Sequence, residues 1–139
     1  MTIAELKEFF NSVRAAKRSL DRLAERAQMY RSLAYKMTGS IEAVPHAKGE
    51  NSSRVENYAT RLIDLADICD ARARTFQEKI QKAEAIISAL PKERHREVLE
   101  LRYLNCKKWE DVAEAMEYKD TRSVHKVHGS ALVSASKIV

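Results

Sequence analysis

The side chains best suited to chemistry in this sequence lie between Leu101 and Leu132, where basic, imidazole and hydroxyl groups alternate with apolar residues. His125 and His128 stand one helical turn apart, a spacing that can hold a metal ion. A zinc site needs two further ligands, and the sequence offers only Cys106 and His95 at spacings that match no known ligand pattern. The pattern therefore favours neither a metal nor another cofactor.

A second set of side chains in the same stretch suits an anionic partner. No acidic residue follows Asp120, and the apolar positions after it face a predicted core. Cations and hydroxyl groups at a helix start suit a phosphate backbone and the acceptor-rich edge of guanine. Two lysines just before a neighbouring helix are suited to phosphate contact. The predicted DNA-contacting residues are Thr121, Arg122, Ser123, His125, Lys126, Lys107 and Lys108.

Three short helices are expected to position these side chains, over residues 92–104, 109–116 and 121–136. Asp120 has the side chain and the place of an N-cap for the third helix. Apolar residues on the second and third helices predict that the two helices cross closely beside Ala113. A support helix followed by helix, short turn and helix is the helix-turn-helix plan.

The residues before Pro91 predict two long amphipathic helices. Over residues 2–36, apolar side chains keep a heptad spacing, and Thr2 with Glu5 has the spacing of a capping box. A loop is expected at about residues 38–52, followed by a second heptad-patterned helix that starts near Ser52 or Ser53. Together they predict a long, coiled-coil-like antiparallel hairpin over residues 1–90, with a C-terminal module over residues 91–139.

Composition supports an all-α protein. The 139 residues include only 3 Gly and 2 Pro, too few for the turns of a sheet protein of this size. The net charge of +5 is compatible with a nucleic-acid partner. The N-terminus has no secretory pattern and no run is apolar enough to span a bilayer, so we expect no membrane association and a location in the cytoplasm.

The stretches "LELRYLNCKKWEDVAEAM" and "RSVHKVHGSAL" resemble the C-terminal module of phage and prophage transcriptional regulators of Gram-positive bacteria. These regulators, of the ArpU and RinA kind, are described as similar to sigma-70 region 4. The sequence departs from the family at Glu117, where a Gly is usual, and in a turn that is one residue longer. The resemblance is most specific at Leu101, Arg102, Tyr103, Trp109, Glu110, Ala113, Met116, Tyr118, Val124, His125, His128, Ala131 and Leu132.

The resemblance implies a sequence-specific DNA-binding transcriptional regulator in a bacterial host cell. Double-stranded DNA is then the main partner. The hairpin is expected to form a homodimer or to contact host RNA polymerase. Two alternatives remain open from the sequence: a helical DNA-packaging subunit similar to a small terminase, and an adaptor that binds polymerase alone. No phosphate-binding loop, nucleophile elbow or zinc cluster indicates an enzyme.

The arginines of the first long helix can be interpreted as a binding surface or as part of a solvated helix face. Arg14, Arg18, Arg22 and Arg26 follow one another along the first long helix, with acidic residues between them. They suit a basic ridge for DNA or polymerase, but a solvated helix surface is the simpler interpretation. Arg102 is expected to pair with a carboxylate and to support the fold.

Overall fold

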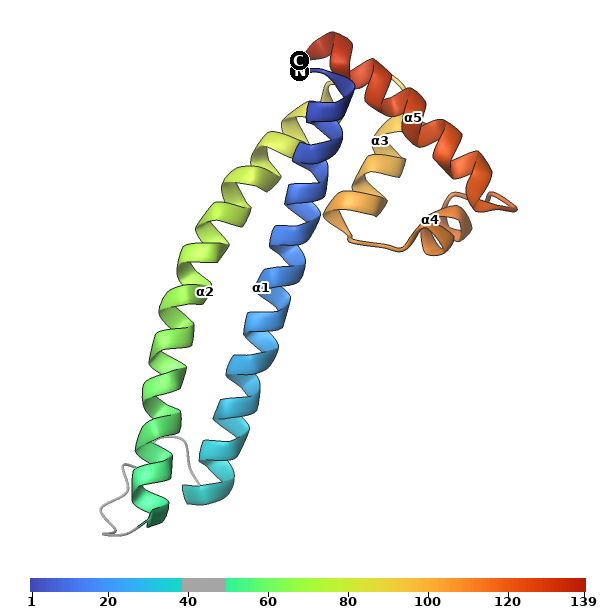
Figure 1. Ribbon diagram of the computed structural model, residues 1–139. Coiled ribbons are helices and arrows are strands. Elements are labelled where there is room, and N and C mark those ends of the chain that lie inside the picture. The colour runs from blue at the N-terminus through green and yellow to red at the C-terminus, as the bar shows by residue number, and fades with distance from the viewer. Residues whose placement is uncertain (39–49) are drawn as a thin grey trace. The chain divides into compact units, whose positions relative to one another are not determined.

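The computed structural model describes residues 1–38 and 50–139, and within these ranges the protein is all-α, as predicted (Figure 1). The predicted loop falls mainly on residues 39–49, which lie outside the described residues. Among the described helices, none is long and apolar enough to cross a membrane. The elements are α1 (Ile3–Thr38), α2 (Glu50–Ser88), α3 (Glu93–Leu99), the π-helix η1 (Glu100–Leu104), α4 (Trp109–Ala115) and α5 (Thr121–Ile138).

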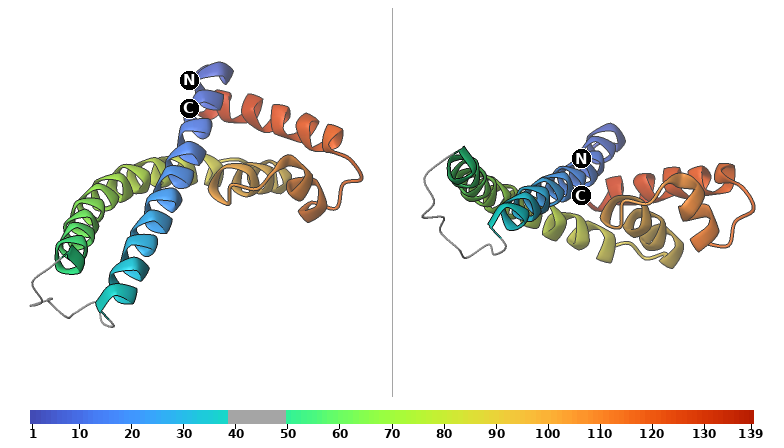
Figure 2. Two further views of the ribbon diagram at one scale, coloured as in Figure 1. Left: turned by 60° about the horizontal axis from the view of Figure 1, so that its bottom comes forward. Right: turned by 90° about the horizontal axis from the view of Figure 1, so that it is seen from below.

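The chain packs as two compact units, and each long helix contributes to both. Unit 1 consists of residues 1–18 and 75–139, and unit 2 consists of residues 19–74. This division differs from the boundary expected near Pro91. The reason is that the first turns of α1 and the last turns of α2 share one apolar core with the C-terminal helices. Within unit 1, α5 lies beside α3 and α4 (Figures 1 and 2).

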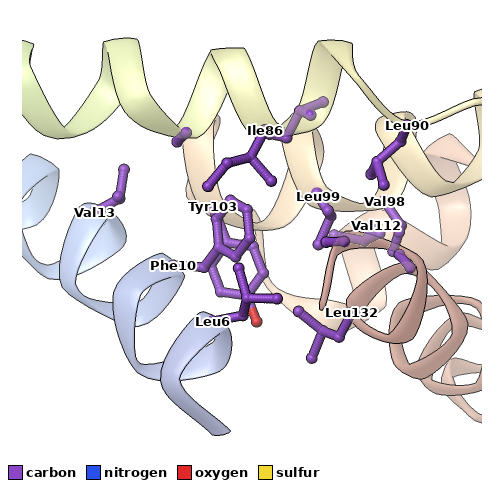
Figure 3. Packing of buried hydrophobic residues seen from close by; sticks show 14 of the residues in the cluster. Leu6, Phe10, Val13, Ile86, Leu90, Val98, Leu99, Tyr103, Val112 and Leu132 are labelled. Carbon is purple, nitrogen blue, oxygen red and sulfur yellow. The ribbon is translucent and has the colours of Figure 1, made fainter. Parts of the chain in front are cut away.

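The core of unit 1 is built around Tyr103, a side chain of η1 that is fully buried (Figure 3). Its ring stacks on Phe10 of α1 with 5.2 Å between the ring centroids. Burial of such large aromatic groups is a main source of stability in a domain of this size. The buried apolar residues around them are Leu6, Val13, Ala83, Ile86, Ile87, Leu90, Val98, Leu99, Val112, Ala113, Met116, Val124, Ala131, Leu132 and Ala135.

Unit 2 consists of the remaining turns of α1 and α2, which pair in antiparallel fashion. An Arg72 guanidinium donates to the Ser19 hydroxyl, and eleven residues further along α1 the Tyr30 hydroxyl accepts from Arg61 at 3.3 Å. The Tyr30 ring also lies 5.8 Å from the ring of Tyr58. The contacts thus move backward along α2 as they move forward along α1, which is the pairing predicted for the hairpin.

The start of α1 confirms the predicted capping box. The backbone N–H of Thr2 donates to Oε2 of Glu5 at 2.8 Å, and the backbone N–H of Glu5 donates to Oγ1 of Thr2 at 3.1 Å. Two N–H groups that the helix leaves without partners are thereby satisfied. The predicted start of the second helix is two to three residues late, because α2 is already helical at Glu50.

The support helix differs from its prediction at its C-terminal end. Residues 92–104 were expected to form a single helix, but α3 ends at Leu99 and the chain continues as the wider π-helix η1. The backbone N–H of Asn105 donates to the carbonyl of Glu100 at 2.9 Å, five residues back. Cys106 then adopts a left-handed φ of 55° and turns the chain toward α4. Wider turns of this kind re-aim side chains and are frequent at functional sites.

Candidate nucleic-acid interface

The turn between α4 and α5 is a Schellman motif, which fixes where α5 begins. The backbone N–H of Tyr118 donates to the carbonyl of Ala113 at 2.8 Å, and that of Glu117 donates to the carbonyl of Glu114 at 3.1 Å. Glu117 adopts a left-handed φ of 62°. This conformation favours glycine. The turn therefore keeps the backbone geometry of a glycine cap while holding a glutamate.

Packing between α4 and α5 follows the predicted inward faces. Val112 and Ala113 of α4, and Met116 at its C-cap, are buried together with Val124 of α5. Tyr118, in the turn, is half-buried and packs against the same core. Its hydroxyl accepts from Arg94, whose guanidinium carbon lies 5.1 Å from the ring centroid. The support helix and the turn are thus joined by a cation–π contact and a hydrogen bond.

The first turn of α5 is capped by Asp120, as predicted. Oδ1 of Asp120 accepts from both the backbone N–H and the hydroxyl of Ser123, each at 3.1 Å. The backbone hydrogen bond from Ser123, and then the hydroxyl hydrogen bond, lower the pKa of the Asp120 carboxyl. Because the Ser123 hydroxyl already donates within the turn, only its acceptor side is left for a partner. A DNA contact by Ser123 stays a prediction.

The other predicted contact residues of α5 lie along its N-terminal half. Arg122, His125 and Lys126 are exposed, whereas Thr121 is half-buried. The His125 ring lies 4.5 Å from the ring of Trp109, the first residue of α4. This contact brings the α5 row next to the segment of Lys107 and Lys108, although the two segments are well separated in sequence. Lys108 is exposed and Lys107 is half-buried.

His128 belongs to the core, unlike His125. Its Nε2 lies 2.6 Å from the hydroxyl oxygen of Tyr103, and its ring meets that of Trp109 edge-on at 4.9 Å. Burial, and then the charge of Lys7, lower the pKa of His128 to about 4, so the ring is neutral at physiological pH. Burial likewise raises the pKa of Tyr103 to about 12. Within the described ranges, no group of three or more His, Cys, Asp and Glu side chains is placed to hold a metal ion.

Arg102 supports the site in a way that the sequence did not reveal. Its Nη1 donates to the carbonyl of Lys107 at 3.0 Å, and its guanidinium carbon lies 4.4 Å from the centroid of the Trp109 ring. Arg102 was expected to pair with a carboxylate, but its partners are the carbonyl of Lys107 and the indole face of Trp109. Both contacts hold the segment before α4 against η1. Their signal in the sequence is weak, because they depend on the π-helix and on the left-handed Cys106.

Arg14 does not belong to a solvated ridge, and that expectation is wrong for this residue. It is half-buried, its Nε is sealed from solvent, and its carbonyl lies 3.9 Å from Sγ of Cys106. The exposed positions of Arg18, Arg22 and Arg26 do agree with a solvated surface. The first turns of α1 are thus close to the segment that leads into α4.

Comparison of the chain with protein-family models, with curated proteins and with solved structures gave no match. The resemblance to phage and prophage regulators therefore stays a prediction.

Proposed function

We propose that the protein is a DNA-binding transcriptional regulator of the phage and prophage type, and that α5 of unit 1 enters the major groove. One observation carries the proposal: Arg122, His125 and Lys126 form an exposed row on a helix that has no acidic residue. Behind this row, the buried Val124 and the Schellman turn fix the helix against α4. A rigid helix with exposed donors matches the way in which helix-turn-helix proteins read base edges.

Within this proposal the cationic residues have different tasks. Arg122 lies in the first turn of α5. From there its long side chain can reach a guanine base, and its guanidinium group can form two hydrogen bonds to it. Lys107 and Lys108 precede α4 and contact phosphate groups, which contributes affinity without reading sequence. His125 and Lys126 complete the exposed row, and Thr121 lies at its edge.

Substitution of Arg122 tests the base-reading role. On the best duplex selected from a random-sequence pool, Arg122→Ala should weaken binding by roughly 1–3 kcal/mol and relax the preference at one base pair. Lys137→Ala is the matched control, because Lys137 is an exposed cation in the last turn of the same helix. Fluorescence anisotropy measures both. Equal losses in the two variants would contradict base reading by the start of α5 and indicate a nonspecific effect of charge.

Substitution of Lys108 tests the phosphate role. Lys108→Ala should weaken binding to all sequences alike and reduce the slope of log affinity against log salt by about one. Titrations of one selected and one scrambled duplex at several salt concentrations provide the measurement. A loss confined to the selected duplex would instead place Lys108 among the base contacts.

The proposal includes a homodimer formed through unit 2. Ile63 is 65% exposed and Met29 is 51% exposed, and Tyr35 and Ile68 are further large apolar groups on the surface of this unit. Exposed groups of this kind are suited to burial in a helix–helix interface. Host RNA polymerase is the second partner that the family resemblance implies. Sedimentation equilibrium should show a dimer that Ile63→Asp weakens and that Ile138→Asp, at an exposed position of unit 1, leaves intact.

A further inference from the structure

Three arginines of unit 1 gather where α1 meets the segment between η1 and α4. Arg14 and Arg102 are half-buried, and Arg18 is exposed one helical turn beyond Arg14. Burial lowers the pKa of Arg102, and the positive charges of Arg14 and Arg18 lower it further. The guanidinium group of an arginine side chain carries a positive charge in proteins. The fold thus holds like charges close together.

Hydrogen-bond donors in this cluster are only partly satisfied. Nε of Arg14 and Nε of Arg102 are both sealed from solvent and have no hydrogen-bond partner in the described structure. One edge of Arg102 is fixed by the Lys107 carbonyl and its face by Trp109. A buried donor without a partner is unfavourable, and so is repulsion between neighbouring cations. An oxyanion bound beside the guanidinium groups offsets the repulsion between their charges.

We infer that Arg14, Arg18 and Arg102 form a binding site for one phosphate group. Guanidinium groups suit this ligand because their planar donors match the oxygens of a phosphate in pairs. Arg102 is preorganised for the task by its contacts with Trp109 and Lys107. Arg14 and Arg18 contribute the second and third charges from α1. The site therefore uses residues from both chain segments of unit 1, residues 1–18 and 75–139.

The position of the cluster indicates that the phosphate belongs to DNA, which rests on the proposed function. Arg102 lies on the Trp109 ring, and the same ring contacts His125 of the exposed α5 row. Trp109 therefore links the arginine cluster to the α5 surface that is proposed to enter the major groove. A free phosphate ion offers the same chemistry, and the experiment has to separate the two sources.

The first arm of the experiment uses inorganic phosphate and the full-length chain. Thermal unfolding is followed with increasing phosphate at constant ionic strength, with chloride as the reference salt. Phosphate should raise the melting temperature, and Arg14→Gln and Arg18→Gln should each weaken the apparent affinity by about tenfold. Arg26→Gln, which removes an exposed charge from the same helix, should keep the wild-type response. Because Arg18 is exposed, its variant should fold even if the Arg14 variant does not.

The second arm uses DNA and identifies the source of the phosphate. If a backbone phosphate occupies the site, Arg18→Gln weakens binding to every duplex alike and lowers the salt slope by about one, whereas Arg26→Gln changes neither. If Arg18→Gln changes only the response to inorganic phosphate, the site is confirmed and its ligand is a free phosphate. An absence of DNA binding by the wild-type chain defeats the proposed function but leaves the first arm valid. The phosphate site is overturned if phosphate stabilises no more than chloride, or stabilises the arginine variants equally.

Discussion

Units 1 and 2 are built from the same two long helices but differ in how completely they bury them. In unit 1 the turns of α1 and α2 pack against η1 and the short helices, so Leu6, Phe10 and Val13 are all fully buried. In unit 2 the helices have only each other within the described residues, and Leu23 and Leu65 are among the few buried side chains. An apolar stripe is buried fully only where further elements cover it.

This difference in burial matches the two roles proposed for the units. Unit 1 holds its exposed cations on helices with a well-buried core, which suits the proposed reading of a fixed pattern of base edges. Unit 2 leaves large apolar groups such as Ile63 on its surface, which suits association with another helical surface. The proposed DNA contacts and the proposed dimer contacts therefore fall on different units.

The same substitution made in each unit gives the largest expected effect. Leu6→Ala removes a fully buried side chain of unit 1 and should lower the free energy of unfolding by roughly 3–5 kcal/mol. Leu23→Ala, on the same helix in unit 2, should lower it by roughly 2–3 kcal/mol, because the sparser surroundings leave a smaller cavity. Urea unfolding at one fixed protein concentration gives both values. A greater loss from Leu23→Ala would overturn the contrast in packing between the units.

Acidification should affect unit 1 through His128. Its pKa of about 4 in the folded chain lies below the usual value of 6.5, so the unfolded chain binds the proton more tightly. Stability is therefore complete above about pH 7 and falls as the pH drops toward 4, by roughly 1–2 kcal/mol between pH 7 and pH 5. His128→Gln keeps a polar partner for Tyr103 without titrating, so the fall should be smaller. If both proteins lose stability equally, the acid sensitivity arises elsewhere.

A change at Glu117 should have the smallest effect and the opposite sign. Glu117→Gly removes the backbone strain of a non-glycine residue with a left-handed φ. The exchange should stabilise unit 1 by roughly 0.5–1 kcal/mol. Glu114→Gly is the matched control: the same exchange on an exposed position inside α4 should destabilise by roughly 1 kcal/mol. Thermal unfolding of the two variants shows whether each exchange raises or lowers the stability. Destabilisation by both exchanges would mean that the Glu117 side chain makes a contact worth more than the strain.

Periodic patterns made most of the fold predictable from the sequence. Heptad spacing predicted both long helices, and short-range signals predicted the Thr2–Glu5 capping box and the Asp120 cap. These features depend on residues close together in the chain, so a local rule describes them. The exposed positions of Arg122, His125 and Lys126 followed in the same way, from the apolar residues on the opposite side of α5.

Features that depend on contacts between distant segments could not be predicted. The π-helix η1 exists where Tyr103 reaches both Phe10 and His128, and no local pattern encodes that packing. Arg14 was predicted to lie on a solvated helix surface because acidic residues alternate with the arginines along α1. In the structure its carbonyl lies 3.9 Å from Sγ of Cys106, a residue that is distant in sequence. The arginine cluster was missed for this reason.

The most direct test of the central claim is a selection of bound fragments from a random-sequence DNA library at moderate salt, with wild type and Arg122→Ala in parallel. If α5 reads DNA sequence, the wild-type protein should enrich a motif, and the variant should lose the preference at one position of it. No enriched motif for the wild-type protein would contradict the claim that α5 reads DNA sequence.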